Sequence, residues 1–360
     1  MIQYAHFKCQ QCGSDMDYAI GQNSLQCVSC GATNPIESTQ DVIDQPHDYE
    51  LTKKNLDYLT PQSSQLELHC SNCGATFLMA ADQHAGDCPY CDLNIVVPAE
   101  QHRQLAPDYV LPFEVDDKTA TQSFRKWLRK LWFAPSKLKL KAFKSQPMKS
   151  VYIPMWSFDA EVSSSYQGRR GDYYTTYRTV TRRVNGRSQT SRQPVQEIRW
   201  RSVSGHVFNV FKHVYTFASK ALPDKFLNFL SRWDFQKVQS YKPDYLSGFQ
   251  SQLYQLGIDV GYQRAQQIMD ITIRSSIRSD IGGDQQQIHQ VNSDYKQVKF
   301  RLVLVPVYMA AFSFKNKIYR YVIHGQSGKT YGERPWSWLK IIGTLLLLAS
   351  IGVAVFMYQR

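Results

Sequence analysis

The residues with the clearest chemistry in this 360-residue chain are its eight cysteines, all of which precede residue 92. They form two groups with one spacing: a Cys-x2-Cys pair, fourteen residues, then a second pair, repeated at an offset of 61 residues. Two tight turns can bring four thiolates onto one tetrahedral ion, so each group predicts a structural zinc site. The predicted ligands are Cys9, Cys12, Cys27 and Cys30 for one Zn2+, and Cys70, Cys73, Cys88 and Cys91 for the other.

Three other chemistries share this pattern. Disulfides are disfavoured because the start, MIQYAHFKCQ, lacks the basic and apolar regions of an export signal. A redox pair needs no second pair at a fixed distance. Iron–sulfur ligation stays open, although the paired turns favour zinc. Four thiolates leave no free coordination position, so the predicted ions are structural and not catalytic.

The residues around the cysteines complete this prediction. Glycine or aspartate follows each turn, where a positive φ is often needed, at Gly13, Gly31, Gly74 and Asp92. Three histidines nearby are predicted to be surface residues and not ligands: His6, His69 and His84.

Charge divides the chain into two unlike parts. Residues 1–117 carry 4 Lys/Arg against 17 Asp/Glu, whereas residues 118–360 carry 38 against 13. The first predicted ribbon has one basic residue, Lys8, and the second has none between Glu67 and Asp92. Because phosphate backbones are bound by Lys and Arg, both ribbons should repel nucleic acid. We therefore expect them to dock a protein partner.

The basic part begins with a predicted amphipathic helix over 119–133, which Pro135 ends. Its apolar residues, Phe124, Trp127, Leu128, Leu131 and Trp132, recur at three- and four-residue steps between basic residues. Such a helix can pack on its own domain or lie on an anionic membrane, and we favour packing on the domain.

Beyond this helix the chain is predicted to be rich in β-strands. We expect a strand over 151–166, a hairpin turning at Asn185-Gly186, a helix over 260–281 and further strands over 298–324. Nine arginines lie between residues 169 and 201, against Asp172 and Glu197 alone. This hairpin could meet lipid headgroups, nucleic acid or an acidic partner, or it could simply face solvent.

The C-terminal segment 341–358 is uncharged and almost wholly apolar, and as a helix it would be about 27 Å long. Trp336 and Trp338 precede it and Tyr358 ends it, as in the aromatic belts of membrane spans. Basic residues stand before the span, which predicts a single-pass tail anchor in the inner membrane with the N-terminal part in the cytoplasm.

One short segment of the chain suggests a catalytic motif. Gly325-Gln-Ser-Gly-Lys-Thr330 suggests a phosphate loop, but Ile323 stands where that motif needs a glycine, so we interpret it as a turn between short strands. Neither a G-x-S-x-G nor an H-E-x-x-H motif occurs in the sequence. We expect no enzyme activity.

The chain resembles a family of bacterial tail-anchored membrane proteins with two zinc ribbons, often labelled "primosomal protein N′ (replication factor Y), superfamily II helicase". The shared stretches are the ribbons, LPFEVDDKTATQSFRKWLRKLWFAPSKLK, YIPMWSFDAEVSSSYQG, YLSGFQSQLYQLG, LVPVYMAAFSF and HGQSGKTYGERPWSWLK. No helicase motor motifs accompany them. Some members are encoded beside phage-shock-protein-A-like and SPFH-type proteins. The resemblance implies a membrane scaffold in an envelope-stress system.

These observations predict two small β zinc ribbons and an α+β domain, ending in a single transmembrane helix. The expected ranges are 1–37 and 65–98 for the ribbons, 38–64 for a linker with a short helix, 99–335 for the basic domain and 336–358 for the anchor. The expected function is a non-enzymatic adaptor that recruits a cytoplasmic protein to the inner membrane, with the basic domain on anionic lipid. The alternative is a membrane-tethered protein whose basic domain binds nucleic acid.

Overall fold

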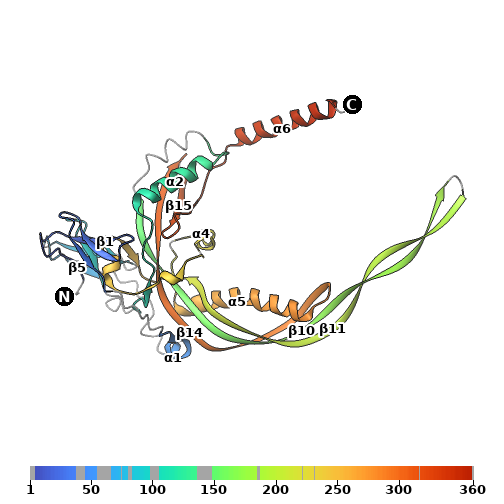
Figure 1. Cartoon of the computed structure of the whole chain (residues 1–360), viewed down its shortest axis with the longest axis horizontal. Helices are drawn as coiled ribbons and strands as arrows, with labels where there is room; N and C mark the ends of the chain where they lie inside the picture. Colours follow the sequence, from blue (N-terminus) through green and yellow to red (C-terminus); the bar gives the residue numbers. More distant parts are fainter. Residues whose placement is uncertain are drawn as a thin grey trace.

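The computed structural model describes residues 5–37, 45–54, 66–73, 75–79, 83–97, 105–135, 148–184, 187–220, 222–230, 232–315 and 317–358 (Figure 1). Gly74, the hairpin turn at 185–186 and the linker segments 38–44 and 55–64 lie outside this part of the chain.

Three long strands form the frame of the body: β10 (Lys149–Val184), β11 (Arg187–Phe217) and β14 (Gln285–Phe314). β10 lies between the other two and pairs antiparallel with both. The predicted strand over 151–166 is confirmed but is only the first half of β10. Val184 pairs with Arg187, so the predicted hairpin is confirmed by its flanking strands. Figure 1 shows these strands curving away from the body as a long arm.

The helix α5 (Ile258–Ile281) covers one face of the long strands and confirms the helix predicted over 260–281. Its buried residues recur every four positions from Gly261 through Ala265 and Met269 to Ile281, so one continuous stripe faces the sheet. Gly261 allows the closest approach, because a Cβ there would meet Trp156 Cδ1 at 2.5 Å. The indole Nε1 of Trp156 donates to the carbonyl of Leu256 at 2.9 Å.

The helix α2 (Asp117–Lys130) packs its apolar face on the body, as the sequence analysis favours. Phe124 and Leu128 are buried, and Phe124 stacks on Tyr321 with ring centroids 4.0 Å apart. Asp116 caps the helix by accepting from the backbone N–H of Thr119 at 2.9 Å. Trp132, just after the helix, is 77% exposed.

Shorter elements complete the sheet and its cover. They are β9 (Tyr109–Val110), α4 (Asp224–Phe229), β12 (Gln239–Ser240), β13 (Gln250–Gln252), β15 (Lys317–His324) and β16 (Thr330–Gly332), with 3-10 helices at Phe235–Lys237 and Pro243–Leu246. β15 and β16 pair antiparallel, and Gly328 between them has a φ of +66°. The segment 325–330 is therefore a turn between short strands, as predicted.

The N-terminal quarter of the chain forms small strands around the cysteines. β1 (Met16–Ala19), β2 (Ser24–Cys27) and β3 (Thr33–Pro35) make one sheet, and β5 (Leu66–His69) with β6 (Thr76–Met79) makes another. β7 (Gln83–Asp87) and β8 (Asn94–Val96) belong to the eleven-stranded sheet of the body. We call residues 5–37 the first cysteine module and the described part of 66–97 the second.

The described part of the predicted linker is packed on the body. β4 (His47–Asp48) pairs with β14, and α1 (Tyr49–Lys54) follows it. Tyr49 is buried, its hydroxyl donates to Asp259 at 2.6 Å, and its ring lies 4.5 Å from that of Tyr262. The predicted short helix is confirmed, and the contacts of Tyr49 with Asp259 and Tyr262 hold it against α5.

The chain ends in α6 (Trp338–Tyr358), which Figure 1 shows projecting from the body. It is strongly apolar, and none of its described residues is buried. Within the described residues it is the one helix long and apolar enough to cross a membrane.

Candidate metal centres

The structure brings the eight predicted ligands together in two groups of four. In each group the sulfur atoms all lie within 4.8 Å of one another. In the first, Cys9 and Cys30 are 3.5 Å apart at Sγ, and Cys12 and Cys27 are 3.4 Å apart. The corresponding distances in the second are 3.7 Å for Cys70 to Cys91 and 3.9 Å for Cys73 to Cys88.

These distances fit one tetrahedral ion. Four sulfurs at about 2.3 Å from a central Zn2+ would be about 3.8 Å apart. They are too far apart for disulfides, whose sulfurs are about 2.05 Å apart, and all eight cysteines are free. They are too close for a multi-iron cluster, in which the four thiolates are divided between two or four iron atoms.

The turns that carry the cysteines share one backbone pattern. The N–H of the first cysteine of each turn donates to a carbonyl five residues on, at 2.8 Å in all four cases: Cys9 to Ser14, Cys27 to Ala32, Cys70 to Ala75 and Cys88 to Leu93. Three of the four residues after the turns have the positive φ that the sequence predicts, at Gly13 (+74°), Gly31 (+75°) and Asp92 (+55°). The repeat at 61 residues is thus a repeat of structure.

Hydrogen bonds to sulfur lower the pKa of three of the thiols, those of Cys12 and Cys27 in the first group and of Cys91 in the second. The backbone and side chain of Ser14 lower the pKa of Cys12 to about 6. The side-chain amide of Asn72, whose Nδ2 lies 3.5 Å from the sulfur, lowers the pKa of Cys91 to about 7. Because a metal binds the thiolate, these donors favour loading near neutral pH.

The three histidines near the cysteines lie outside both groups of sulfur atoms. His6 and His69 are exposed, as predicted. The surface prediction is wrong for His84, which is 1% exposed on β7, with Nε2 2.6 Å from the hydroxyl of Tyr241. β7 is drawn into the body sheet by pairing with β13, which the local sequence does not signal.

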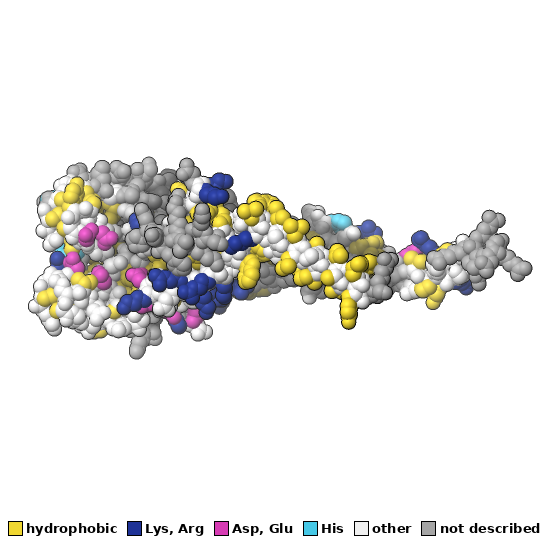
Figure 2. Space-filling view, turned by 90° about the horizontal axis from the view of Figure 1, so that it is seen from above, with side chains coloured by type: hydrophobic (Ala, Val, Ile, Leu, Met, Phe, Trp, Pro, Cys, Tyr) yellow, Lys and Arg dark blue, Asp and Glu magenta, His cyan; other side chains and the backbone are white. Residues whose placement is uncertain are grey.

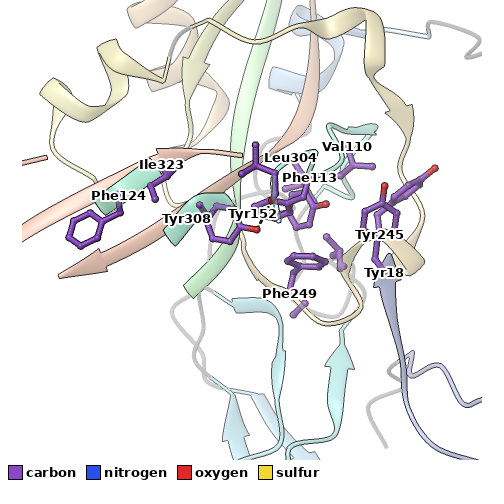
Figure 3. Packing of buried hydrophobic residues seen from close by; sticks show 14 of the residues in the cluster. Tyr18, Val110, Phe113, Phe124, Tyr152, Tyr245, Phe249, Leu304, Tyr308 and Ile323 are labelled. Atoms are coloured by element: carbon purple, nitrogen blue, oxygen red, sulfur yellow. Dashed lines mark hydrogen bonds between the residues drawn. The ribbon is translucent and has the colours of Figure 1, made fainter. Parts of the chain in front are cut away.

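The first cysteine module is fixed to the body through the turn before β13. The N–H of Tyr18 donates to the carbonyl of Ser247 at 3.0 Å, and the hydroxyl of Ser247 donates to the carbonyl of Met16 at 2.7 Å. The ring of Tyr18 lies 5.3 Å from Tyr245 and 6.3 Å from Phe249 (Figure 3). The module therefore contributes to the largest apolar core and is not a freely swinging unit.

The second cysteine module is joined both to the sheet of the body and to the first cysteine module. Ala85 of β7 pairs with Ser251 of β13, and β13 pairs with β10. Val96 of β8 exchanges two backbone hydrogen bonds, of 2.8 and 3.1 Å, with Ala5 of the first module. The two predicted metal centres are thereby held in one orientation relative to the long sheet.

A basic and aromatic surface surrounds the base of α6. The N–H of Ser337 donates to the carbonyl of Phe133 at 2.8 Å, and Nζ of Lys340 donates to that of Ala134 at 2.7 Å. The guanidinium of Arg334 lies 4.3 Å from the ring centre of Trp336. Figure 2 shows Lys and Arg side chains gathered beside the start of the apolar helix. The basic residues of α2 are Lys118, Arg125, Lys126, Arg129 and Lys130.

The chain is similar along most of its length to one curated bacterial protein. That relative, "Uncharacterized protein YdjG" of Bacillus subtilis (strain 168), is 25% identical over 340 residues, covering 92% of this chain and 90% of the relative. No family model matches the chain. No solved structure matches it.

Proposed function

We propose that the chain is a non-enzymatic adaptor, anchored in the inner membrane, that presents two zinc ribbons to a cytoplasmic protein in an envelope-stress or defence system. The observation that carries this proposal is the joining of α6, a fully exposed apolar helix, to two four-thiolate groups held rigidly on one body. The family resemblance of the sequence supports it.

The anchor follows from the cost of leaving α6 in water. The helix is about 31 Å long, which matches the hydrocarbon core. Its exposed residues include Leu345, Leu346 and Phe356, each at least 60% accessible, and a bilayer would bury them. Lys340 and Arg334 at its base favour a cytoplasmic body, because basic flanks stay on the cytoplasmic side.

The docking role of the ribbons is supported by their outer turns. Val28, between Cys27 and Cys30, is 64% exposed, and Tyr90, between Cys88 and Cys91, is 68% exposed. Exposed apolar side chains on rigid turns, within an acidic N-terminal part, suit a protein partner with an apolar and basic surface. The metal would be structural, because it would be enclosed by four thiolates.

The test is crosslinking and recovery of partners from membranes with Tyr90→Ala, which keeps all eight cysteines. Tyr177→Ala is the matched control, because Tyr177 is 67% exposed but lies on the arm. We expect one partner band to be lost with Tyr90→Ala and kept with the control. A partner pattern that is the same for Tyr90→Ala and wild type, at equal zinc content, would contradict docking through the second ribbon.

A further inference from the structure

The outer end of the arm packs against no other element of the described structure, so packing does not explain its residues. The pairing of β14 with β10 ends at Gln285 and Gly171, and α5 ends at Ile281. Beyond that point the described sheet consists of β10 and β11 alone, over 172–184 and 187–199. We call these residues the distal arm. It extends roughly 40 Å, and none of its described side chains is buried.

The distal arm is strongly basic and carries exposed aromatic rings. Residues 173–199 contain six arginines and one acidic residue, Glu197. Arg178 pairs with Glu197 at 3.1 Å, and the guanidinium of Arg199 lies 4.9 Å from the ring centre of Tyr174. Tyr177 is 67% exposed. Exposed arginine and tyrosine side chains that belong to no apolar core suit contact with a layer that is anionic and partly apolar.

The direction of the arm limits how α6 can enter a bilayer. Figure 1 shows the arm and α6 extending to the same side of the body. A bilayer crossed by α6 in this direction would also meet the arm. The arm cannot lie in hydrocarbon, because its arginines and the backbone groups along the outer edge of β11 would lose their water.

A turn of the chain just before α6 would let the arm lie along the headgroups while α6 crosses the bilayer. Residues 333–337, before α6, are neither helix nor strand. Ser337 and Lys340 are held to the residues that follow α2 by three hydrogen bonds, to the carbonyls of Phe133, Ala134 and Trp132. The chain can turn at this segment if these bonds open when α6 inserts, while α5 keeps the inner arm rigid.

We infer that the distal arm is a second membrane contact, which binds the headgroups of anionic phospholipids. This inference rests on the proposed function, because the anchor holds the arm near the leaflet and raises its local concentration there. Each basic residue near an anionic leaflet strengthens binding about fivefold. The body is then held at two points, α6 and the distal arm, which fixes the height and direction of the cysteine modules.

The experiment uses the full-length protein in vesicles, with the photocrosslinker benzoylphenylalanine replacing Tyr177. A second protein carries it in place of Tyr90, which is equally exposed on the second cysteine module. We expect lipid adducts at 177 and not at 90 in vesicles rich in phosphatidylglycerol, and few at 177 in pure phosphatidylcholine. Alkaline extraction reports separately whether α6 is inserted.

The charge requirement is tested with Arg192→Gln/Arg199→Gln, two exposed arginines of the distal arm. Removing both should weaken the contact roughly thirtyfold. The matched control is Lys53→Gln/Lys54→Gln on α1, which should leave the adducts unchanged. An inserted protein without adducts at 177 would overturn the inference and leave the anchor intact. Salt-sensitive binding of DNA by the arm in place of lipid adducts would also overturn it. A protein that alkaline extraction removes would instead contradict the proposed function.

Discussion

The contact between the first cysteine module and the body includes one close approach at a glycine. Gly248 has a φ of +82°, and a Cβ there would lie 2.8 Å from Cγ and 2.9 Å from Cβ of Asp17. Asp17 cannot easily give way, because its Cβ moves only with β1. Its carboxyl is already partly buried, and this burial, together with the neighbouring charges of Asp15 and Asp87, raises its pKa. Gly248→Ala should therefore loosen this contact.

The size of the effect follows from two costs. The positive φ costs an alanine roughly 1 kcal/mol, and displacing Asp17 adds a similar amount, for a total of about 2 kcal/mol. Local opening of the contact should rise roughly thirtyfold. Hydrogen exchange at the amide of Tyr18, which donates to Ser247, reports this opening. Zinc content should stay unchanged.

The matched control is Gly86→Ala on β7. A Cβ there would meet Met79 at 3.8 Å and Gln83 at 3.9 Å, which are ordinary contacts, and its φ is not positive. We expect exchange at Tyr18 to remain as in the wild type. Equal exchange in the Gly248 and Gly86 variants would refute the reasoning that the module is fixed through this turn.

Two further predictions concern stability and membrane attachment. Burial lowers the pKa of His324 to about 4, so protonation of this side chain opposes folding. The free energy of unfolding should therefore be highest above about pH 6.5 and fall by about 1–3 kcal/mol as the pH approaches 4. Urea unfolding across this range should show the fall, and His324→Gln should lose most of it; an equal fall in both proteins would assign it to other groups. Deletion of 337–360 should release the protein to the soluble fraction at high salt, because the remaining basic contacts are screened. If the truncated protein stayed with membranes through a high-salt wash, an apolar insertion elsewhere, first at Trp132, would be required.

The sequence predicts the features that depend on local spacing. The positive φ at Gly13, Gly31 and Asp92 follows from the spacing of the cysteines, and the hairpin between β10 and β11 follows from Asn185-Gly186. The helices α2 and α5 follow from apolar residues at three- and four-residue steps. Each of these signals lies within one element, where backbone geometry alone sets the period.

The features that sequence reasoning missed depend on contacts between distant residues. β10 continues through polar residues because β11 and β14 pair with it on both sides as far as Gly171, and β11 alone pairs with it from there to Val184. His84 is buried because β7 pairs with β13, more than 160 residues later. Tyr49, in the predicted linker, is buried by α5 through Asp259 and Tyr262. No local pattern around these residues marks them as part of the body.

The most direct test of the account is metal analysis of the purified full-length protein, combined with X-ray absorption at the metal edge. We expect two zinc ions per chain, each with four sulfur neighbours at about 2.3 Å. Cys9→Ser/Cys12→Ser and Cys70→Ser/Cys73→Ser should each remove one ion. One metal per chain, iron in place of zinc, or oxygen and nitrogen neighbours would contradict it.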